Sequence, residues 1–196
     1  MKEKLKNLSI SVRLLIIAIV IFTIAYSGII GIIGQTLWNS EAEGSLIKEN
    51  GQVVGSQLIG QEFNDAKFFH SRPSSIDYNA MKSGSQNLSP RNPILTQRVE
   101  NILQKISKNR KAENLKVPST LVTESGSALD PHITVRSALI QIPRISKNTG
   151  IPENELDSLV VKYSKDKILG IFGMKRVNVL KLNIELDNRL EGKNID

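Results

Sequence analysis

The sequence contains no cysteine, only two histidines and few aromatic residues, which make up 5% of the chain. Without cysteine there can be no disulfide, no thiolate metal site and no cysteine nucleophile. The scarcity of aromatic side chains leaves no row of stacking platforms, so a net charge of +7 does not indicate a nucleic-acid-binding protein. His70 and His132 are far apart and lack metal-ligand spacing, so we predict no metal site.

Charged residues are absent from one long apolar run, Leu14 to Ile33. As a helix this run would span roughly 30 Å, the thickness of the hydrocarbon core of a bilayer. A cleaved signal peptide would have a shorter apolar region ending in small residues, so the sequence favours a retained transmembrane helix. Basic residues precede the run, whereas Glu41 and Glu43 are the first charges after it, which predicts a cytoplasmic N-terminus.

The predicted protein is therefore a single-pass protein of the cell membrane. Its expected parts are a short cytoplasmic N-terminus over residues 1–13, a transmembrane helix over 14–33, a connector over 34–45 and an extracytoplasmic domain over 46–196. The remaining length suits one core of ordinary size. The expected fold class is α+β, with one N-terminal transmembrane helix followed by a single extracytoplasmic α+β domain.

Local patterns predict the elements of this domain. Alternation of apolar and polar residues about Asn50-Gly51 is typical of a β-hairpin, here over residues 46–59, and the Ser-, Asn-, Gly- and Pro-rich stretch 63–93 predicts a long loop. Helical spacing predicts a helix over 93–111. Four further elements are expected: a short strand over 117–122, a helix over 132–142 capped by Asp130-Pro131 and interrupted at Pro143, a helix opening at Pro152, and a strand over 177–186 whose end could instead be helical.

Small residues gather in the outer half of the apolar run. They are Ser27, Gly28, Gly31 and Gly34, which would lie on neighbouring faces of one helix. Such a cluster allows a second helix to approach closely and so predicts a partner in the membrane. The alternative is that glycine is simply common in transmembrane helices.

Motifs for catalysis are incomplete. The segment Gly170 to Lys175 lacks the spacing and the hydroxyl of a phosphate-binding loop, so we predict no ATP hydrolysis by this chain alone. Ser164 and Lys167 form an S-x-x-K pair, but the S-D-N and K-T-G elements that accompany it in penicillin-binding enzymes are missing. We therefore assign no catalytic residue.

Two polar positions have open interpretations. Arg72, before Pro73, could bind an anion or a carboxylate of a partner, or it could lock its own loop by bonding to backbone carbonyls, which we favour. Gln141 and Arg144 could contact the base and phosphate of a nucleotide, since an amide and a guanidinium suit those groups. A helix that exposes its polar face explains the same residues, and we favour that interpretation.

An ordered series of short motifs resembles the C subunit of the Kdp potassium-transporting ATPase over nearly the whole chain. The series is GSQLIGQ from Gly55, Ser71-Arg72-Pro73-Ser74, Tyr78-Asn79, SGSQNLSPRNP from Ser83 to Pro93, LVTESGSALDPHI from Leu121 to Ile133, Gln141-Ile142-Pro143-Arg144, and Arg176 to Leu180 with Leu182-Asn183. Seven residues in these motifs are candidates for contact with a partner or for a structural role. They are Arg72, Pro73, Ser83, Asn87, Asn92, Asp130 and Asn178.

The resemblance implies a non-catalytic accessory subunit of a high-affinity, ATP-driven potassium uptake complex. Its expected partners are an ATP-hydrolysing P-type subunit and a potassium-channel-like subunit, together with the lipid bilayer. The resemblance also implies a catalytic-chaperone role that raises the ATP affinity of the hydrolysing subunit, with Gln141 and Arg144 as the candidate nucleotide contacts. No tightly bound cofactor is expected, and ATP shared with the partner subunit is the one candidate.

The predicted topology and the loop from Ser83 limit what the resemblance implies, and an alternative function is open. The predicted topology places the domain across the membrane from cytoplasmic ATP, so action by assembly, by control of ion entry or by conformational bias is favoured. In the loop from Ser83, the family usually reads SGGSNLGPSNP, and the glycines lost in this chain remove access to positive φ there. The alternative function is a membrane-anchored extracytoplasmic hydrolase or binding protein, which a Ser-Lys or Ser-His pair in one pocket would support.

Overall fold

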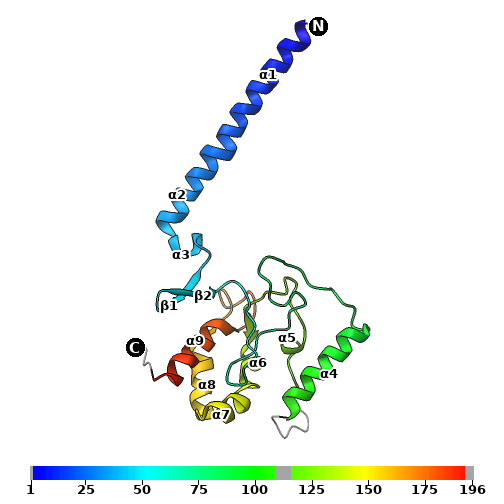
Figure 1. The fold of residues 1–196 in the computed structure, drawn as a ribbon, viewed down its shortest axis with the longest axis vertical. Helices are drawn as coiled ribbons and strands as arrows, with labels where there is room; N and C mark the ends of the chain where they lie inside the picture. Colours follow the sequence, from blue (N-terminus) through cyan, green and yellow to red (C-terminus); the bar gives the residue numbers. More distant parts are fainter. Residues whose placement is uncertain (1, 109–115, 193–196) are drawn as a thin grey trace. The chain divides into compact units, whose positions relative to one another are not determined.

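The computed structural model describes residues 2–108 and 116–192 of the chain. These residues divide between two compact units, one ending at Leu46 and the other beginning at Ile47. The first unit is mainly helical and the second mixes helices with short strands (Figure 1). This confirms the predicted class, an α+β domain that follows one N-terminal apolar helix.

One continuous helix, long and apolar enough to cross a membrane, occupies Lys2–Leu37. It consists of α1 (Lys2–Ile19), a π-helical stretch η1 (Val20–Tyr26) and α2 (Ser27–Leu37), and it has no buried residue. The helix therefore extends beyond the predicted run on both sides. A further turn, α3 (Asn39–Ala42), lies in the expected connector.

The predicted hairpin is present. Strands β1 (Leu46–Glu49) and β2 (Gln52–Ser56) pair with each other around Asn50 and Gly51. These two residues have φ angles of 50° and 79°, the left-handed conformations that a tight type I′ turn requires. The Asn-Gly pair supplies them because both residues tolerate positive φ.

The centre of the second unit is a small antiparallel sheet with the order β3-β5-β4. Its strands are β3 (His132–Thr134), β4 (Ser164–Lys165) and β5 (Arg176–Asn178). The register places Ile133 and Ser164 on either side of Val177. The sheet thereby joins the middle of the domain to its C-terminal part.

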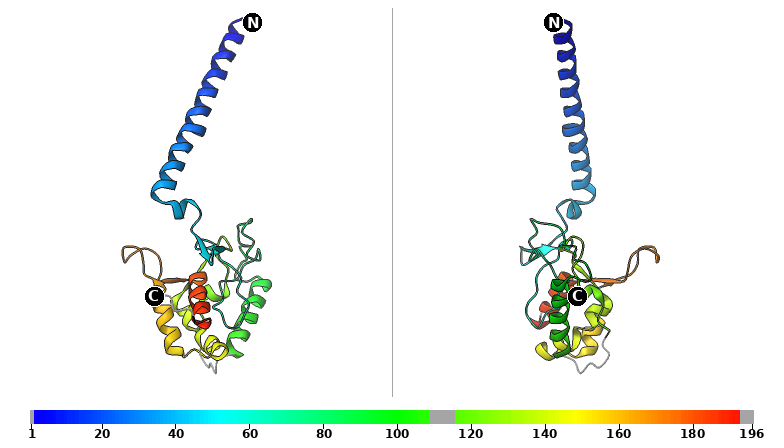
Figure 2. Two further views of the ribbon diagram at one scale, coloured as in Figure 1. Left: turned by 60° about the vertical axis from the view of Figure 1, so that its left-hand side comes forward. Right: turned by 90° about the vertical axis from the view of Figure 1, so that its right-hand side faces the viewer.

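Helices cover this sheet. They are α4 (Pro93–Lys108), α5 (Ser119–Val122), α6 (Val135–Leu139), α7 (Ile142–Thr149), α8 (Glu153–Lys162) and α9 (Val179–Leu190). In Figures 1 and 2, α7, α8 and α9 gather at one side of the domain and α4 lies at the other. The core consists of buried apolar side chains, among them Phe69, Ile133, Ile142, Ile145, Leu156, Leu159, Val160, Val177, Leu182 and Leu186.

The expected helix over 132–142 is wrong in its start. Asp130 does not cap a helix; its Oδ1 accepts from the amide of His132 at 3.0 Å, a turn that leads into strand β3. The helix begins only after Thr134, whose Oγ1 accepts from the amide of Ser137. Pro143 lies in the first turn of α7, where a backbone N–H would have no hydrogen-bond acceptor within the helix, so the proline is tolerated.

The expected strand over 117–122 is wrong, whereas the strand expected over 177–186 is present only at its start and the helix left open at its end begins at Val179. Residues 119–122 form the single turn α5, and the second strand ends at Asn178. The side chain of Asn178 accepts from the amide of Lys181 and so starts α9, which buries Leu182 and Leu186 on one face. The helices over 93–108 and from 153 agree with prediction, and residues 109–111 of the first lie outside the described residues.

Candidate functional site

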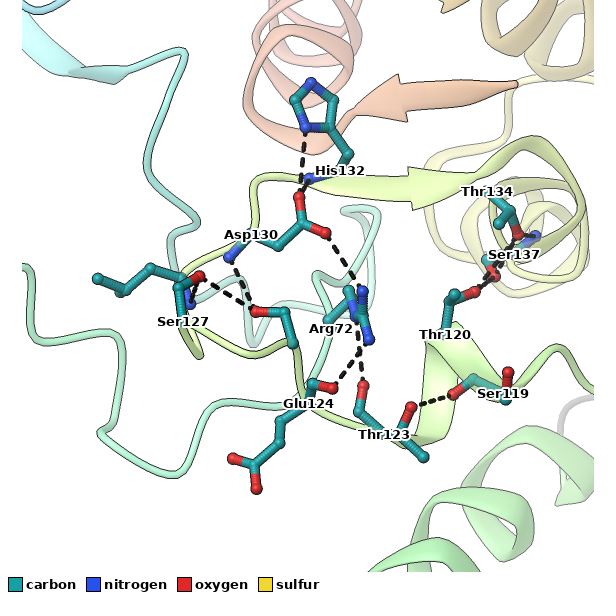
Figure 3. A network of polar contacts seen from close by, with 12 residues as sticks. Arg72, Ser119, Thr120, Thr123, Glu124, Ser127, Asp130, His132, Thr134 and Ser137 are labelled. Carbon is teal, nitrogen blue, oxygen red and sulfur yellow. Dashed lines mark hydrogen bonds and ion pairs between the residues drawn. The ribbon is translucent and has the colours of Figure 1, made fainter. Parts of the chain in front are cut away.

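Arg72 is the centre of a polar network that connects two loops (Figure 3). Its Nε donates to the carbonyl of Thr123 at 3.3 Å, and its Nη2 donates to the carbonyl of Glu124 at 2.8 Å. Its Nη1 pairs with Oδ2 of Asp130 at 3.2 Å. A planar guanidinium can reach all three acceptors at once. This is the arrangement that the loop-locking interpretation describes.

Asp130 links this network to strand β3. Its Oδ1 accepts from the backbone amide of His132 and lies 3.3 Å from Nδ1 of the same residue. Burial opposes ionisation of Asp130, but the hydrogen bonds from His132 and the charge of Arg72 outweigh it and keep the pKa of the carboxyl below 3.8. Asp130 is therefore a carboxylate at neutral pH, and the Arg72 pair is ionic.

Backbone contacts hold the same loops together. The amides of Gly84 and Ser85 donate to the carbonyls of residues 127 and 126, each at 3.0 Å, and the amide of Gly60 donates to the carbonyl of Leu129 at 2.7 Å. A Cβ on Gly60 would lie 2.9 Å from the carbonyl oxygen of Asp130, so only glycine fits this approach. Three of the sequence motifs thus meet at one place.

The loop that departs from the family pattern has an ordinary backbone at the exchanged positions. Within it, positive φ angles occur at Gly84 and Asn87, at 129° and 49°, and not at the four exchanged residues Ser85, Gln86, Ser89 and Arg91. The exchanges therefore require no left-handed backbone. Ser83 and Asn87 are exposed, whereas the side chain of Asn92 accepts from the amide of Ile94 and caps α4 ahead of Pro93.

Gln141 is buried, at 5% exposure, and does not lie on a polar helix face. Its Oε1 accepts from the amide of His70 at 2.8 Å and from Nη2 of Arg144 at 2.8 Å. Its Nε2 donates to the carbonyls of His70 and Ser137, both at 3.2 Å. A primary amide has two acceptor sites and two donor hydrogens. All four are used within this chain, which corrects the expectation of an exposed amide.

Arg144 binds the same loop one turn further on. Its Nη1 donates to the carbonyl of Ala66, and its Nη2 donates to the carbonyl of Phe68 at 2.8 Å. Burial lowers the pKa of Arg144 to about 10, so the guanidinium stays charged at neutral pH. Gln141 and Arg144 are therefore brought together, and both hold the backbone of residues 66–70.

Asn183, on α9, makes the matching contact to Phe69. Its Oδ1 accepts from the Phe69 amide and its Nδ2 donates to the Phe69 carbonyl, both at 2.8 Å. Gln141 and Asn183 thus supply to residues 69 and 70 the paired bonds that a neighbouring strand would supply. The name amide clasp is used below for these two side chains with Phe69 and His70. Asn183 lies in the last of the quoted motifs, but sequence reasoning assigned it no role.

A cavity of about 260 Å³ adjoins the clasp. Its walls are mostly apolar and come from α4, α5 and the α6–α7 junction, and its polar lining includes Glu62, His70, Lys105 and Arg144. Burial, and then the charge of Arg144, lower the pKa of His70, so its imidazole is neutral at neutral pH. The other side of the cavity contains Pro73 and Tyr78, whose pKa burial raises to about 12.

The comparisons with known proteins agree with this arrangement of motifs. The sequence model of KdpC, the c chain of the K+-transporting ATPase, matches residues 8–188. The chain belongs to the KdpC family. The potassium-transporting ATPase KdpC subunit of Bacillus mycoides (strain KBAB4) is 44% identical over 193 residues, covering 97% of this chain and 100% of that protein. The subunits of that name from Bacillus cereus (strain Q1) and Bacillus cytotoxicus are 43% and 40% identical, over 193 and 192 residues, with the same coverage.

Two serine hydroxyls of this KdpC chain, including the one in the S-x-x-K pair, bond to backbone carbonyls. Oγ of Ser164 donates to the carbonyl of Val161, and Oγ of Ser71 donates to the carbonyl of Gln61, both at 2.8 Å. Each hydroxyl hydrogen is directed at a carbonyl and not at a base. In the part of the chain that the structure describes, no group of three or more histidine or acidic side chains is arranged to hold a metal ion.

Two further predicted residue sets lie away from the clasp and the Arg72 network. Asn178 starts α9 and also donates through Nδ2 to the carbonyl of Gln57 at 2.8 Å. The four small residues of the apolar run all lie in α2. A Cβ added to Gly28 or Gly31 would meet no atom within 4 Å, so this surface of the helix is open.

Proposed function

We propose that this chain is a non-catalytic accessory subunit of a high-affinity, ATP-driven potassium uptake complex. It would assist assembly and function of the P-type ATP-hydrolysing subunit and of the potassium-channel-like subunit. Membership of the KdpC family and the names of the relatives support a place in a potassium-transporting ATPase. The apolar helix Lys2–Leu37 supports attachment to the cell membrane.

One observation carries the non-catalytic part of the proposal: the polar side chains suited to chemistry are engaged with their own backbone. Arg72, Gln141 and Arg144 together bond to seven backbone groups of loop and helix segments. A group held in this way positions the chain that it binds, and it has little freedom to serve a reacting molecule. These contacts suit a domain that presents a rigid surface to a partner.

The N-terminus would be cytoplasmic and the domain extracytoplasmic, because Lys2, Lys4, Lys6 and Arg13 precede the apolar run. An effect on ATP affinity would then be indirect. A domain that binds one conformation of the pump better than another shifts the population towards that conformation, and the ATP affinity changes with it. Direct nucleotide contact by Gln141 and Arg144 stays a prediction, and it would require the nucleotide to replace bonds of the amide clasp.

Affinity purification of the tagged full-length chain from native membranes in mild detergent, with mass spectrometry of the co-purifying chains, tests the assembly. We expect a P-type ATPase and a channel-like subunit. Gly31→Leu should reduce their recovery, because the open space beside Gly31 admits the new side chain within this chain and any clash is with a partner helix. Ala18→Leu, outside the small-residue cluster, is the matched control. Recovery of this chain alone would contradict the proposal.

Topology can be tested in the same strain, because the chain has no cysteine of its own. Ser158→Cys places one thiol on the exposed face of α8. We expect a membrane-impermeant maleimide to label it in cells whose cytoplasmic membrane is intact. Labelling that appears only after this membrane is opened would reverse the proposed orientation.

A further inference from the structure

The connection between β4 and β5 presents an apolar tip to solvent. Residues 166–175 extend away from the rest of their domain as a protruding loop, drawn in orange in Figure 2. Every residue from 165 to 175 is exposed. Five of these exposed side chains are apolar: Ile168, Leu169, Ile171, Phe172 and Met174, with exposures of 59%, 84%, 74%, 63% and 58%. Isolated exposed apolar residues are common, but five within seven positions form a patch that needs an explanation.

The tip is ordered by its own backbone. The amide of Ile168 donates to the carbonyl of Phe172 at 2.9 Å, and the amide of Phe172 returns a bond of 3.0 Å. Leu169 has a φ angle of 53° and Gly170 one of 72°. Leucine is a costly residue in the left-handed region, where glycine or asparagine would serve the turn better. The leucine side chain, 84% exposed, contributes nothing to the core, so its advantage must lie outside the domain.

The base of the loop is basic. It contains Lys165, Lys167, Lys175 and Arg176 against a single acid, Asp166, which pairs with Lys175 at 3.2 Å. An apolar tip with four basic residues at its base matches the order of layers in an anionic bilayer, where the hydrocarbon lies beneath the phosphate groups. A protein partner is less consistent with this composition, because protein interfaces are depleted in lysine.

The tether keeps the start of this domain close to the membrane in which Lys2–Leu37 is proposed to lie. Nine residues, 38–46, follow the helix that ends at Leu37. Even fully extended, nine residues span only about 30 Å. We therefore propose that the 166–175 loop is a second, peripheral membrane contact, in which the apolar tip enters the interface of a bilayer containing anionic lipid and the four cations of the base bind the headgroups. This inference rests on the proposed anchoring of Lys2–Leu37 in the same membrane.

The contact would fix the rotation of the domain about its tether. A single helix and a short connector allow a domain many orientations, and a second contact point removes most of them. Aliphatic side chains and one phenylalanine supply the insertion, and each cation near an anionic surface contributes about fivefold in the docking equilibrium. Raised salt should weaken the attraction between the cations and the anionic lipids and leave the insertion of the apolar side chains unchanged.

The test uses the full chain in vesicles of phosphatidylcholine with or without phosphatidylglycerol. Leu169→Cys gives a single thiol at the tip, which is labelled with an environment-sensitive nitrobenzoxadiazole dye. Nitroxide groups on the lipid acyl chains should quench this dye, and more strongly when phosphatidylglycerol is present. The dye on Ser158→Cys, at the exposed face of α8, should be quenched little. Ile171→Ser with Phe172→Ser should abolish quenching at residue 169.

A double variant, Lys165→Gln with Lys167→Gln, should reduce docking to phosphatidylglycerol vesicles by roughly 25-fold, at about fivefold per cation, with little change on phosphatidylcholine. Flotation of the vesicles distinguishes a failure of the helix anchor from a failure of the loop contact. A chain that does not float contradicts the anchor and this proposal with it. A chain that floats while its tip dye stays in water contradicts the loop contact alone. Shielding of the dye only in the assembled complex, without quenching by lipid nitroxides, would assign the loop to a protein partner and overturn the proposal.

Discussion

Replacing Gln141 with alanine should destabilise the domain by roughly 3–5 kcal/mol, because three buried or half-buried backbone groups lose a partner and each costs about 1–3 kcal/mol. The groups are the amide and carbonyl of His70 and the carbonyl of Ser137. Arg144 loses one acceptor as well. Against a total stability of about 5–15 kcal/mol, this is a large fraction.

The assay is urea unfolding of the purified full-length chain in detergent, followed by circular dichroism. Asn154→Ala, an exposed amide on α8, is the matched control and should change stability by less than about 0.5 kcal/mol. Gln141→Glu keeps an acceptor for the His70 amide but cannot donate to the two carbonyls, so it should also destabilise. Hydrogen exchange at the Phe69 and His70 amides should accelerate in both Gln141 variants.

An unchanged urea midpoint in Gln141→Ala would refute this reasoning. If the variant then altered the ATP dependence of the complex, Gln141 would act by touching nucleotide, and its four bonds within this chain would be incidental. Loss of stability together with weaker ATP dependence would assign the ATP effect to the shape of the domain.

Three further outcomes follow from other contacts. Gly60→Ala should destabilise the domain by about 1–3 kcal/mol, because the new Cβ would lie 2.9 Å from the Asp130 carbonyl oxygen. Gly126→Ala is the control and should be tolerated, because its Cβ would meet no atom within 4 Å. The urea midpoints of the two variants are compared. Arg72→Lys should cost roughly 1–3 kcal/mol in the same assay, since an ammonium cannot serve two loop carbonyls and a carboxylate in one plane. Folding lowers the pKa of His70, so the unfolded chain binds the proton more readily than the folded chain. The free energy of unfolding should therefore fall as the pH decreases from about 6.5 towards the pKa of His70 in the folded state. His70→Gln should reduce this loss, which urea titrations at several pH values measure.

Strong local signals made part of the fold predictable. The apolar run required a helix, and Asn50-Gly51 required a tight turn whichever way the rest of the chain folded. The helix that starts at Glu153 has acidic residues in its first turn and follows a proline, and these signals do not depend on tertiary contacts. Such elements are fixed by their own residues.

The errors occurred where a single polar side chain decides between two elements. Asp130 could cap a helix or make a turn into a strand, and the partner that decides is Arg72, which lies 58 residues away. Asn178 could continue a strand or start a helix, and its own side chain caps α9. The apolar residues of β5 are followed directly by the apolar face of α9, and together they resemble the alternation of one longer strand.

The amide clasp had one signal that could have been used. Gln141 has apolar residues on both sides, and a glutamine within such a segment is either exposed on a turn or buried with all its bonds made. Asn183 gives no comparable signal. Its partner, Phe69, is 114 residues earlier in a segment without a regular element, and no local pattern indicates that pair.

Three of the bonds that order the first part of the domain come from α9 and its capping residue Asn178, which constrains the sequence of folding events. Contacts join Glu49 to Asn188, Gln57 to Asn178 and Phe69 to Asn183, over separations of 139, 121 and 114 residues. Contacts so distant in sequence form late, because a long loop must close before any of them is gained. During synthesis, Gln57 and Phe69 lack their bonds to Asn178 and Asn183 until α9 has emerged, although partners such as Gln141 and Arg144 are already present for other residues of the segment 57–70. A chain that stops before α9 should therefore leave this segment open to proteases, even though every residue of the segment is already present.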